Sequence, residues 1–387
     1  MNRKDLAEIK RRLNPDKRYP SVLRGCYLGA DGHVIAEFAK SVGALAQEEC
    51  EKFMAIFRKC LSGTEGQNLL NLDFTPEQME ADAHHLLTGL CDTGLQDVQI
   101  VEDFFRRAIA WRQEEFVHLQ SVDDQQAADN YLVLLLHDGY DVPYRDDNGD
   151  LDKERSESIL NYILCAVCPV KQLKPALRYF EGDSEFHAGA SDQVVGMPEM
   201  GFMFPAFEER SANIHRALYY TRDTGDLHAS FIEGMLNADV QMTAQEQKET
   251  FQSILTETLA EECSMDLMQN VHETISTMIE EQKADKTAEA LCMDKQDVKR
   301  VLEECGVSEE KTEAFAARYE ESFGEQAAIP AVNMIAPKQF KVDTPSVTIR
   351  VDPQHSDLIQ TRILDGKSYI VILADGDVEV NGVKITC

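Results

Sequence analysis

Four apolar runs lie close together in the middle of the chain, and they limit the folds open to it more than any other feature. They occupy residues 131–136, 162–170, 201–207 and 217–220. Their lengths and their β-branched and aromatic residues favour buried strands. Some connections between the runs are too short for the crossover helix that parallel strands require. The runs therefore predict a central sheet that is largely antiparallel.

Helical patterns flank this central block on both sides. Apolar residues recur with helical spacing between Cys50 and Leu61, and a further helix is expected from about Asp97. Thr75-Pro76-Glu77-Gln78 combines an N-cap, a proline in the first turn and a capping-box partner, so another helix should begin there. After the central block, helices are expected from Thr243 to about Phe323, with a tight corner at Gly306.

Three dipeptides near the C-terminus suit hairpin turns because their residues tolerate positive φ. They are Asp365-Gly366, Asp375-Gly376 and Asn381-Gly382. They separate short runs rich in β-branched residues, which predicts a small β-meander.

These patterns together predict an α+β protein. Its parts are a basic arm and helical region over residues 1–120 and a central, mainly antiparallel sheet domain over 121–240. An acidic helical region over 241–326 and a β-meander domain over 331–387 follow.

The charge of the chain excludes several kinds of partner. Its 387 residues include 69 Asp and Glu against 38 Lys and Arg, a net charge of −31. General DNA binding and an anionic membrane surface both need clustered cations, so neither is expected. The negative charge either keeps the protein in solution or forms an acidic surface for a basic protein partner, such as a ribosomal protein.

The same sequence predicts a cytoplasmic protein. No apolar stretch approaches the roughly 18 residues of a membrane span, and the first residues lack the apolar segment of a secretory signal. The ten cysteines are scattered without a disulfide framework, so reduced thiols are expected.

The first 24 residues form an exception to the acidic composition. Eight Lys and Arg residues outnumber three acidic ones there. On so acidic a protein, this arm is expected to dock against its own chain. The alternative is contact with an external anion, such as structured RNA in a ribonucleoprotein.

No metal or cofactor motif is complete. Cys165 and Cys168 form a C-x-x-C pair, but a second pair is missing, and on a strand the two thiols would point to opposite faces. The acidic loop 146–150 resembles a calcium loop, yet aligning its glycine puts Tyr144 and Arg155 at positions that require carboxylates. We therefore expect packing cysteines, an acidic turn, and no bound metal or cofactor.

Polar residues that flank the central strands are the remaining candidates for catalysis. They are His137, Asp138, Asp141, Arg210 and His215, with Tyr140, Glu199 and Tyr219 nearby in the sequence. Two carboxylates at a strand end suit a metal-assisted hydrolase, in which a histidine would assist. The two aspartates are equally suited to capping a turn and pairing with Arg210. We favour this structural interpretation because nothing else in the sequence completes a ligand site.

Several strings resemble a known family. They are Tyr140–Pro143, Ser158–Val170, Gly201–Phe207 with Arg210, Leu218–Thr221, Gly63–Leu70, Thr361–Gly366 and Val378–Gly382. Together they resemble an uncharacterised family of anaerobic Gram-positive bacteria, known as a domain of unknown function, over nearly the whole chain. The resemblance implies a cytoplasmic bacterial protein and supplies no activity, cofactor or catalytic residue.

The acidic field and the missing active site favour a non-enzymatic regulatory or scaffolding factor that acts through protein contacts. The metal-assisted hydrolase and a ribosome-associated factor that uses the basic arm remain as alternatives.

Overall fold

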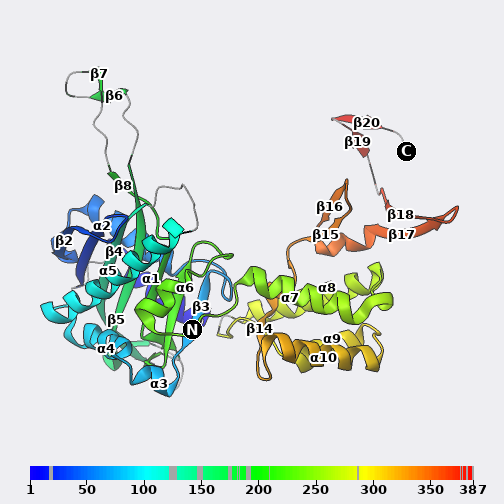
Figure 1. The fold of residues 1–387 in the computed structure, drawn as a ribbon, viewed down its shortest axis with the longest axis horizontal. Helices are drawn as coiled ribbons and strands as arrows, with labels where there is room; N and C mark the ends of the chain where they lie inside the picture. The colour runs from blue at the N-terminus through cyan, green and yellow to red at the C-terminus, as the bar shows by residue number, and fades with distance from the viewer. Residues whose placement is uncertain are drawn as a thin grey trace. The chain divides into compact units, whose positions relative to one another are not determined.

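The computed structural model of the protein (Figure 1) consists of two compact units, Met1–Thr243 and Ala244–Cys387. It describes residues 1–16, 21–121, 129–145, 151–172, 177–180, 182, 184–188, 193–208, 210–285, 287–374, 376, 378–380 and 382–385. The loop predicted as an acidic turn, 146–150, lies outside these residues.

An eight-stranded sheet forms the centre of the first unit. Its strands are β1 (Val22–Leu28), β2 (Val34–Ser41), β3 (Leu69–Asp73), β4 (Asn130–Arg145), β5 (Leu151–Gln172), β8 (Gln193–Val195), β9 (Met200–Phe204) and β12 (Arg216–Thr221). The order is β2-β1-β4-β5-β9-β12-β3, with β8 beside β5, and each pairing is antiparallel. The predicted antiparallel sheet and the α+β class are confirmed. Two-stranded hairpins are formed by β6 (Leu177–Phe180) with β7 (Glu185–Ala188) and by β10 (Ala206–Glu208) with β11 (Ser211–Asn213).

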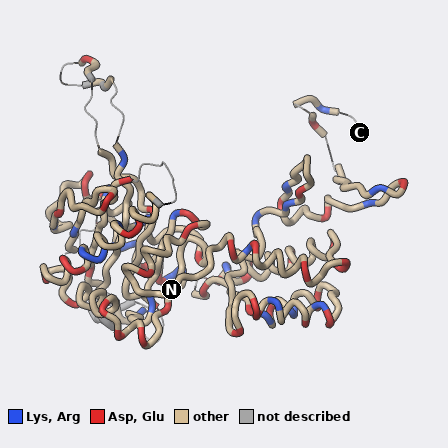
Figure 2. Tube along the Cα trace, viewed as in Figure 1, with Lys and Arg blue, Asp and Glu red and all other residues tan. Residues whose placement is uncertain are grey.

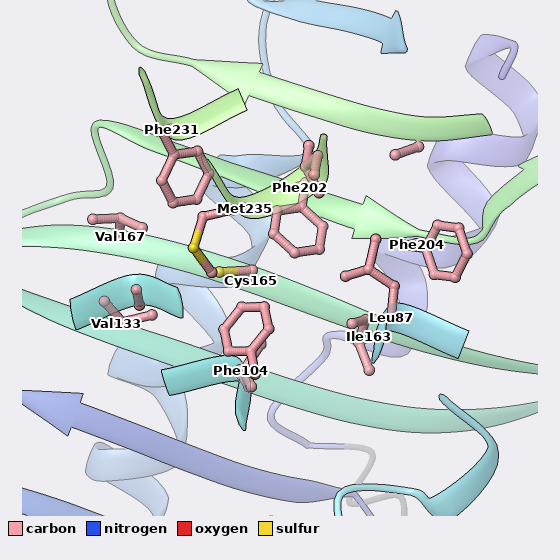
Figure 3. Close-up of a cluster of buried hydrophobic side chains, with 14 of the residues drawn as sticks. Leu87, Phe104, Val133, Ile163, Cys165, Val167, Phe202, Phe204, Phe231 and Met235 are labelled. Atoms are coloured by element: carbon pink, nitrogen blue, oxygen red, sulfur yellow. The ribbon is translucent and has the colours of Figure 1, made fainter. Parts of the chain in front are cut away.

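The central strands are buried on both faces. Consecutive side chains of a strand point to opposite faces, so an unbroken apolar run requires cover on both. One face packs against α4 (Asp82–Thr93), α5 (Val98–Ser121), α6 (Ala229–Phe231) and the π-helical turn η2 (Ile232–Leu236). Figure 3 shows this core, in which Phe104, Phe202 and Phe231 lie close to Cys165. The other face packs against α1 (Arg3–Arg12) and α2 (Gln47–Cys60).

The N-terminal region is not purely helical, because β1, β2 and β3 belong to the same sheet as β4 and β5. The segments 1–120 and 121–240, predicted as separate domains, therefore lie within one compact unit. Two features make β1 and β2 difficult to predict from the sequence. Arg24 and Gly25 interrupt the apolar pattern of β1, and β2 is an edge strand with mostly exposed side chains. The expected capping box at Thr75 is present, but its helix, α3 (Pro76–Met79), is short.

Helices form the core of the second unit. They are α7 (Ala244–Leu259), α8 (Met265–Ala284), α9 (Lys295–Glu304), α10 (Glu309–Phe323) and α11 (Ala331–Met334). Phe251, Ile275 and Phe315 pack at their centre. The predicted corner between α9 and α10 is confirmed, with Gly306 at φ +90°. Within the described parts of both units, none of the helices combines the length and hydropathy needed to cross a bilayer.

The C-terminal strands pair as successive hairpins. They are β15 (Phe340–Asp343) with β16 (Thr348–Val351), β17 (Ile359–Leu364) with β18 (Lys367–Ile372), and β19 (Val378–Val380) with β20 (Val383–Ile385). A further short pair joins β13 (Cys292–Met293) to β14 (Ile329–Pro330). Asp365 and Gly366 both have positive φ in the β17–β18 turn, as the sequence predicts. The short helices η1 (Val42–Ala44), η3 (Ala260–Glu262) and η4 (Pro353–Leu358) complete the described elements of both units.

Gly201 on β9 tests the packing between the sheet and α2. A Cβ atom there would lie 2.4 Å from the carbonyl oxygen of Cys165 and 2.9 Å from Sγ of Cys60. Because backbone cannot yield cheaply, we expect Gly201→Ala to lower the free energy of unfolding by about 1–3 kcal/mol. Urea denaturation measures the change. Gly43→Ala is the control, since a Cβ there meets only Oγ of Ser41 at 3.9 Å; equal losses in both variants would contradict the close approach.

Candidate functional site

The carboxylate of Asp138 lies in the interior of β4 and is surrounded by donors. Arg12 donates from Nε to Oδ2 at 2.5 Å and from Nη2 to Oδ1 at 2.8 Å. Ser21 donates to Oδ1 at 3.2 Å, and the hydroxyl of Tyr162 donates to Oδ2 at 2.9 Å. The Asp138 side chain is 3% exposed. With four donors on two oxygens, this carboxylate has no open face for a metal or a substrate.

Arg12 reaches Asp138 because α1 lies across the sheet. Leu6 and Ile9 of this helix are buried in the core, and Arg12 in its last turn projects towards β4. The guanidinium also lies over the ring of Tyr140, 4.8 Å from its centroid. The Tyr140 hydroxyl donates to Glu8 on the same helix. Burial, together with the Glu8 hydrogen bond and charge, raises the pKa of Tyr140 above its usual range. The polar network therefore anchors α1 to the sheet.

Arg12, and not Arg210, is the counter-ion of Asp138. Arg210 lies in the turn between β10 and β11, at φ +65°. Its guanidinium donates to Glu8 at 3.3 Å and to the carbonyl oxygen of Pro143. The expectation of a strand-edge arginine beside Asp138 rests on the position of both residues next to central apolar runs. It missed a partner 126 residues away.

The other candidate residues do not converge on Asp138. Because β4 continues to Arg145, Asp138 and Asp141 lie within a strand, three positions apart, and point to opposite faces. His137 also lies on the face opposite Asp138. Exposed His215 precedes β12, so β5 and β9 lie between it and β4.

The nearby polar candidates have local partners. Glu199 accepts hydrogen bonds from Tyr131 at 2.7 Å and Arg222 at 2.5 Å. The buried hydroxyl of Tyr219 donates to the carbonyl oxygen of Leu227 at 2.8 Å. These contacts join elements of the fold.

His137 lies on β4, and its half-buried imidazole ring packs against the C-terminal end of α4. A Cβ on Gly94 would lie 3.2 Å from its Cε1, so the ring packs directly on the backbone there. Its Nε2 is buried and has no hydrogen-bond partner among the described residues. Burial lowers the pKa of His137, while the charge of Asp138 and the backbone of Cys91 act in the opposite direction. The neutral ring is therefore favoured in the folded protein.

Cys165 and Cys168 point to opposite faces of β5, as predicted, and each is buried in a different core cluster. Burial, with a contribution from the charges of neighbouring groups, raises the pKa of Cys168 to about 12 and that of Cys165 further. Both thiols are therefore protonated packing groups. Across the described residues, no group of His, Cys, Asp and Glu side chains is arranged to hold a metal ion.

Acidic residues outnumber basic ones on the helices of the second unit, and Figure 2 marks both kinds along the chain trace. Residues 244–330 contain 21 Asp and Glu against 8 Lys and Arg, and almost all of the described carboxylates are exposed. Several cations are already engaged by carboxylates of the same helices. Lys295 pairs with Glu320, Lys299 with Glu313, and Arg318 with Glu321. A large excess of negative charge remains on this surface.

A groove between α8 and α9 lies within this acidic region. It has a volume of about 490 Å³ and is lined, among the described residues, by Asn270, Glu273, Thr274, Thr277, Met278, Glu304 and Cys305. Glu273 and Glu304 are both exposed, and the described lining contains no Lys or Arg. The groove thus offers two carboxylates, hydroxyl groups and a methionine. Those groups suit a partner that carries Lys or Arg beside apolar side chains.

Comparison with known proteins gives the family. The family model for a domain of unknown function, DUF4317, matches residues 1–383. The chain belongs to the DUF4317 family. No curated protein matches the chain. Membership confirms the resemblance to a domain-of-unknown-function family, and it assigns no activity to Asp138 or to the acidic groove.

Asp138→Ala tests the buried ion pair, because it leaves the Arg12 guanidinium without its counter-ion. We expect the free energy of unfolding to fall by roughly 3–5 kcal/mol. Chemical denaturation measures the loss. Asp103→Ala is the matched control, since Asp103 pairs with Arg106 on an exposed face and should lose under about 1 kcal/mol. Losses of similar size in the two variants would overturn the buried-pair account.

His137 should make stability depend on pH. Its folded pKa lies below the unfolded value of about 6.5, so the unfolded chain takes up the proton first. The effect is absent above about pH 7, and stability is lost as pH falls through about 6.5 towards the lowered folded pKa. Unfolding free energies measured between about pH 7 and pH 5 should decline less steeply in His137→Gln. Parallel slopes for both proteins would rule out this contribution.

Proposed function

We propose that the protein is a non-enzymatic cytoplasmic factor that regulates or scaffolds by binding a basic protein partner. The observation that carries this proposal is the acidic groove between α8 and α9, where Glu273 and Glu304 face a depression with no described cation in its lining. Cations of a partner would find unneutralised carboxylates there. The groove is part of a surface whose negative charge steers basic proteins towards it.

The chemistry of the groove supports recognition rather than catalysis. Two exposed carboxylates and two threonine hydroxyls accept hydrogen bonds from Lys and Arg side chains, while Met278 supplies an adaptable apolar contact. A catalytic pair of carboxylates would need one pKa raised by burial or by a close like charge. Both glutamates are exposed. The groove therefore suits a surface-binding role.

The two alternatives gain no comparable support. A metal-assisted hydrolase would need the carboxylate of Asp138, which Arg12, Ser21 and Tyr162 occupy. An RNA-binding arm would need a row of free cations, and two cations of this arm are engaged, because Arg12 pairs with Asp138 and Arg3 lies 3.6 Å from Glu65. The contacts of α1 favour docking of the arm on its own protein.

The double variant Glu273→Gln/Glu304→Gln tests the proposal. We expect the unmodified protein to capture a basic protein from native lysate at low ionic strength and to release it near 1 M salt, where the Debye length is about 3 Å. The double variant should capture several-fold less, as measured by quantitative pull-down. Its fold should persist, because both glutamates are exposed.

Glu102→Gln/Glu114→Gln is the matched control, because it removes two exposed charges from α5 of the first unit. This variant should capture as much partner as the unmodified chain. Equal loss in both double variants would indicate general charge attraction, and capture that ignores ionic strength would contradict the electrostatic proposal.

A further inference from the structure

The corner between α1 and α2 holds a second depression, with the opposite charge. Its volume is about 360 Å³, and the described residues that line it are Lys10, Arg11, Asn14 and Arg58. Three of these four side chains are cationic. In a chain with a net charge of −31, such a concentration of positive charge is unusual.

The two arginines of this depression form no ion pair among the described residues. The described ion pairs of α1 and α2 engage Arg3, Glu8, Arg12 and Glu49, and neither Arg11 nor Arg58 forms one. Both of these arginines are exposed. Lys10 is half-buried; burial lowers its pKa, and the charge of Glu65 acts against this.

Asn14 adds a neutral donor to the cations. Its Oδ1 accepts from the backbone N–H of Asp16 at 3.1 Å, which leaves its Nδ2 hydrogens directed elsewhere. Asp16 is exposed and is the acidic residue nearest to Asn14 in the sequence. Lys10 and Arg11 lie in the last turn of α1, and Asn14 follows the C-cap residue Leu13, so the three line the depression at the C-terminal end of this helix.

We propose that this depression binds a small phosphorylated molecule, with the guanidinium groups of Arg11 and Arg58 and the ammonium of Lys10 on its phosphate oxygens. Arginine forks bind phosphate through paired hydrogen bonds, and a lysine adds a point charge. Like charges held close together repel one another, and a bound phosphate group relieves this repulsion.

A small ligand fits better than a nucleic acid. RNA binding requires a row of cations that neutralises successive phosphates. The chain carries a net charge of −31, which disfavours binding of such a polyanion. A depression of this volume lies at the lower end of the range for small-molecule sites.

The same cations have a simpler structural role available. All three lie in the last turns of α1 and α2, where positive side chains interact favourably with the helix dipole. A purely structural role predicts that removing a cation lowers thermal stability and that no phosphate compound binds. A binding role predicts that binding is lost while thermal stability is kept.

Calorimetric titration with pyrophosphate and with inorganic phosphate separates these outcomes. We expect saturable binding of pyrophosphate to the full chain, tighter than that of phosphate. Arg11→Ala and Arg58→Ala should each weaken it by about tenfold or more, the effect of losing a charge-assisted hydrogen bond. Lys52→Ala is the matched control, because it removes an exposed cation from α2 that does not line the depression.

Three results would overturn the proposal. They are an absence of saturable binding, equal weakening in Lys52→Ala and Arg58→Ala, and tighter binding of a short single-stranded RNA than of pyrophosphate. Thermal unfolding of each variant without ligand gives the second readout. A lowered melting temperature with unchanged pyrophosphate binding would assign the cations to helix stabilisation alone.

Discussion

The burial of β4 and β5 on both faces is the constraint on which the rest of the first unit depends. Their paired interior residues, such as Leu134 opposite Ala166, leave water on neither side of the sheet. Such strands need a helical layer on each face. One layer comes from α4, α5 and η2, and the other requires α1 and α2. The first residues of the chain are thus part of the core.

The position of α1 is fixed by a polar contact within this apolar cover. Burial of the Leu6 and Ile9 side chains holds α1 on the sheet but does not fix its orientation. The paired hydrogen bonds from Arg12 to Asp138 depend on direction and so favour one orientation of the helix. A buried ion pair adds little net stability over an apolar pair of similar shape, but removing one partner is costly. Here Ser21 and Tyr162 complete the shell of the carboxylate. The network therefore specifies where the helix lies.

The sequence predicts the elements whose apolar pattern is local. The runs at 131–136 and 162–170 became β4 and β5, and the helical spacing from Cys50 became α2. β1 and β2 were missed because their burial comes from neighbours far away in the chain, and Arg24 breaks the local pattern. The C-terminal turn at Asp365 was predictable because positive φ restricts residue choice. Strand pairing beyond each hairpin has no such local signal.

The polar site was less predictable for the same reason. Asp138, Tyr140 and Arg210 stood out as polar residues beside apolar strands, and they do lie in or beside one network. Its central partner, Arg12, was visible only as part of a basic arm. Once β4 is known to extend through Asp141, alternation alone separates Asp138 from both His137 and Asp141. The length of β4 is what the sequence pattern did not reveal, and it decides which of these side chains share a face.

Charge is distributed between the two units by different physical demands. In the first, Asp138 neutralises Arg12 of α1, and Glu8 of α1 pairs with Arg210, so both carboxylates contribute to the fold. In the second, carboxylates outnumber cations on helices whose apolar core is already complete, so there are too few cations to neutralise them all. Closely spaced like charges destabilise the helices that carry them. Under the proposed function, a basic partner relieves that repulsion when it binds. The same carboxylates that lower the stability of the free helices would then raise the affinity for the partner.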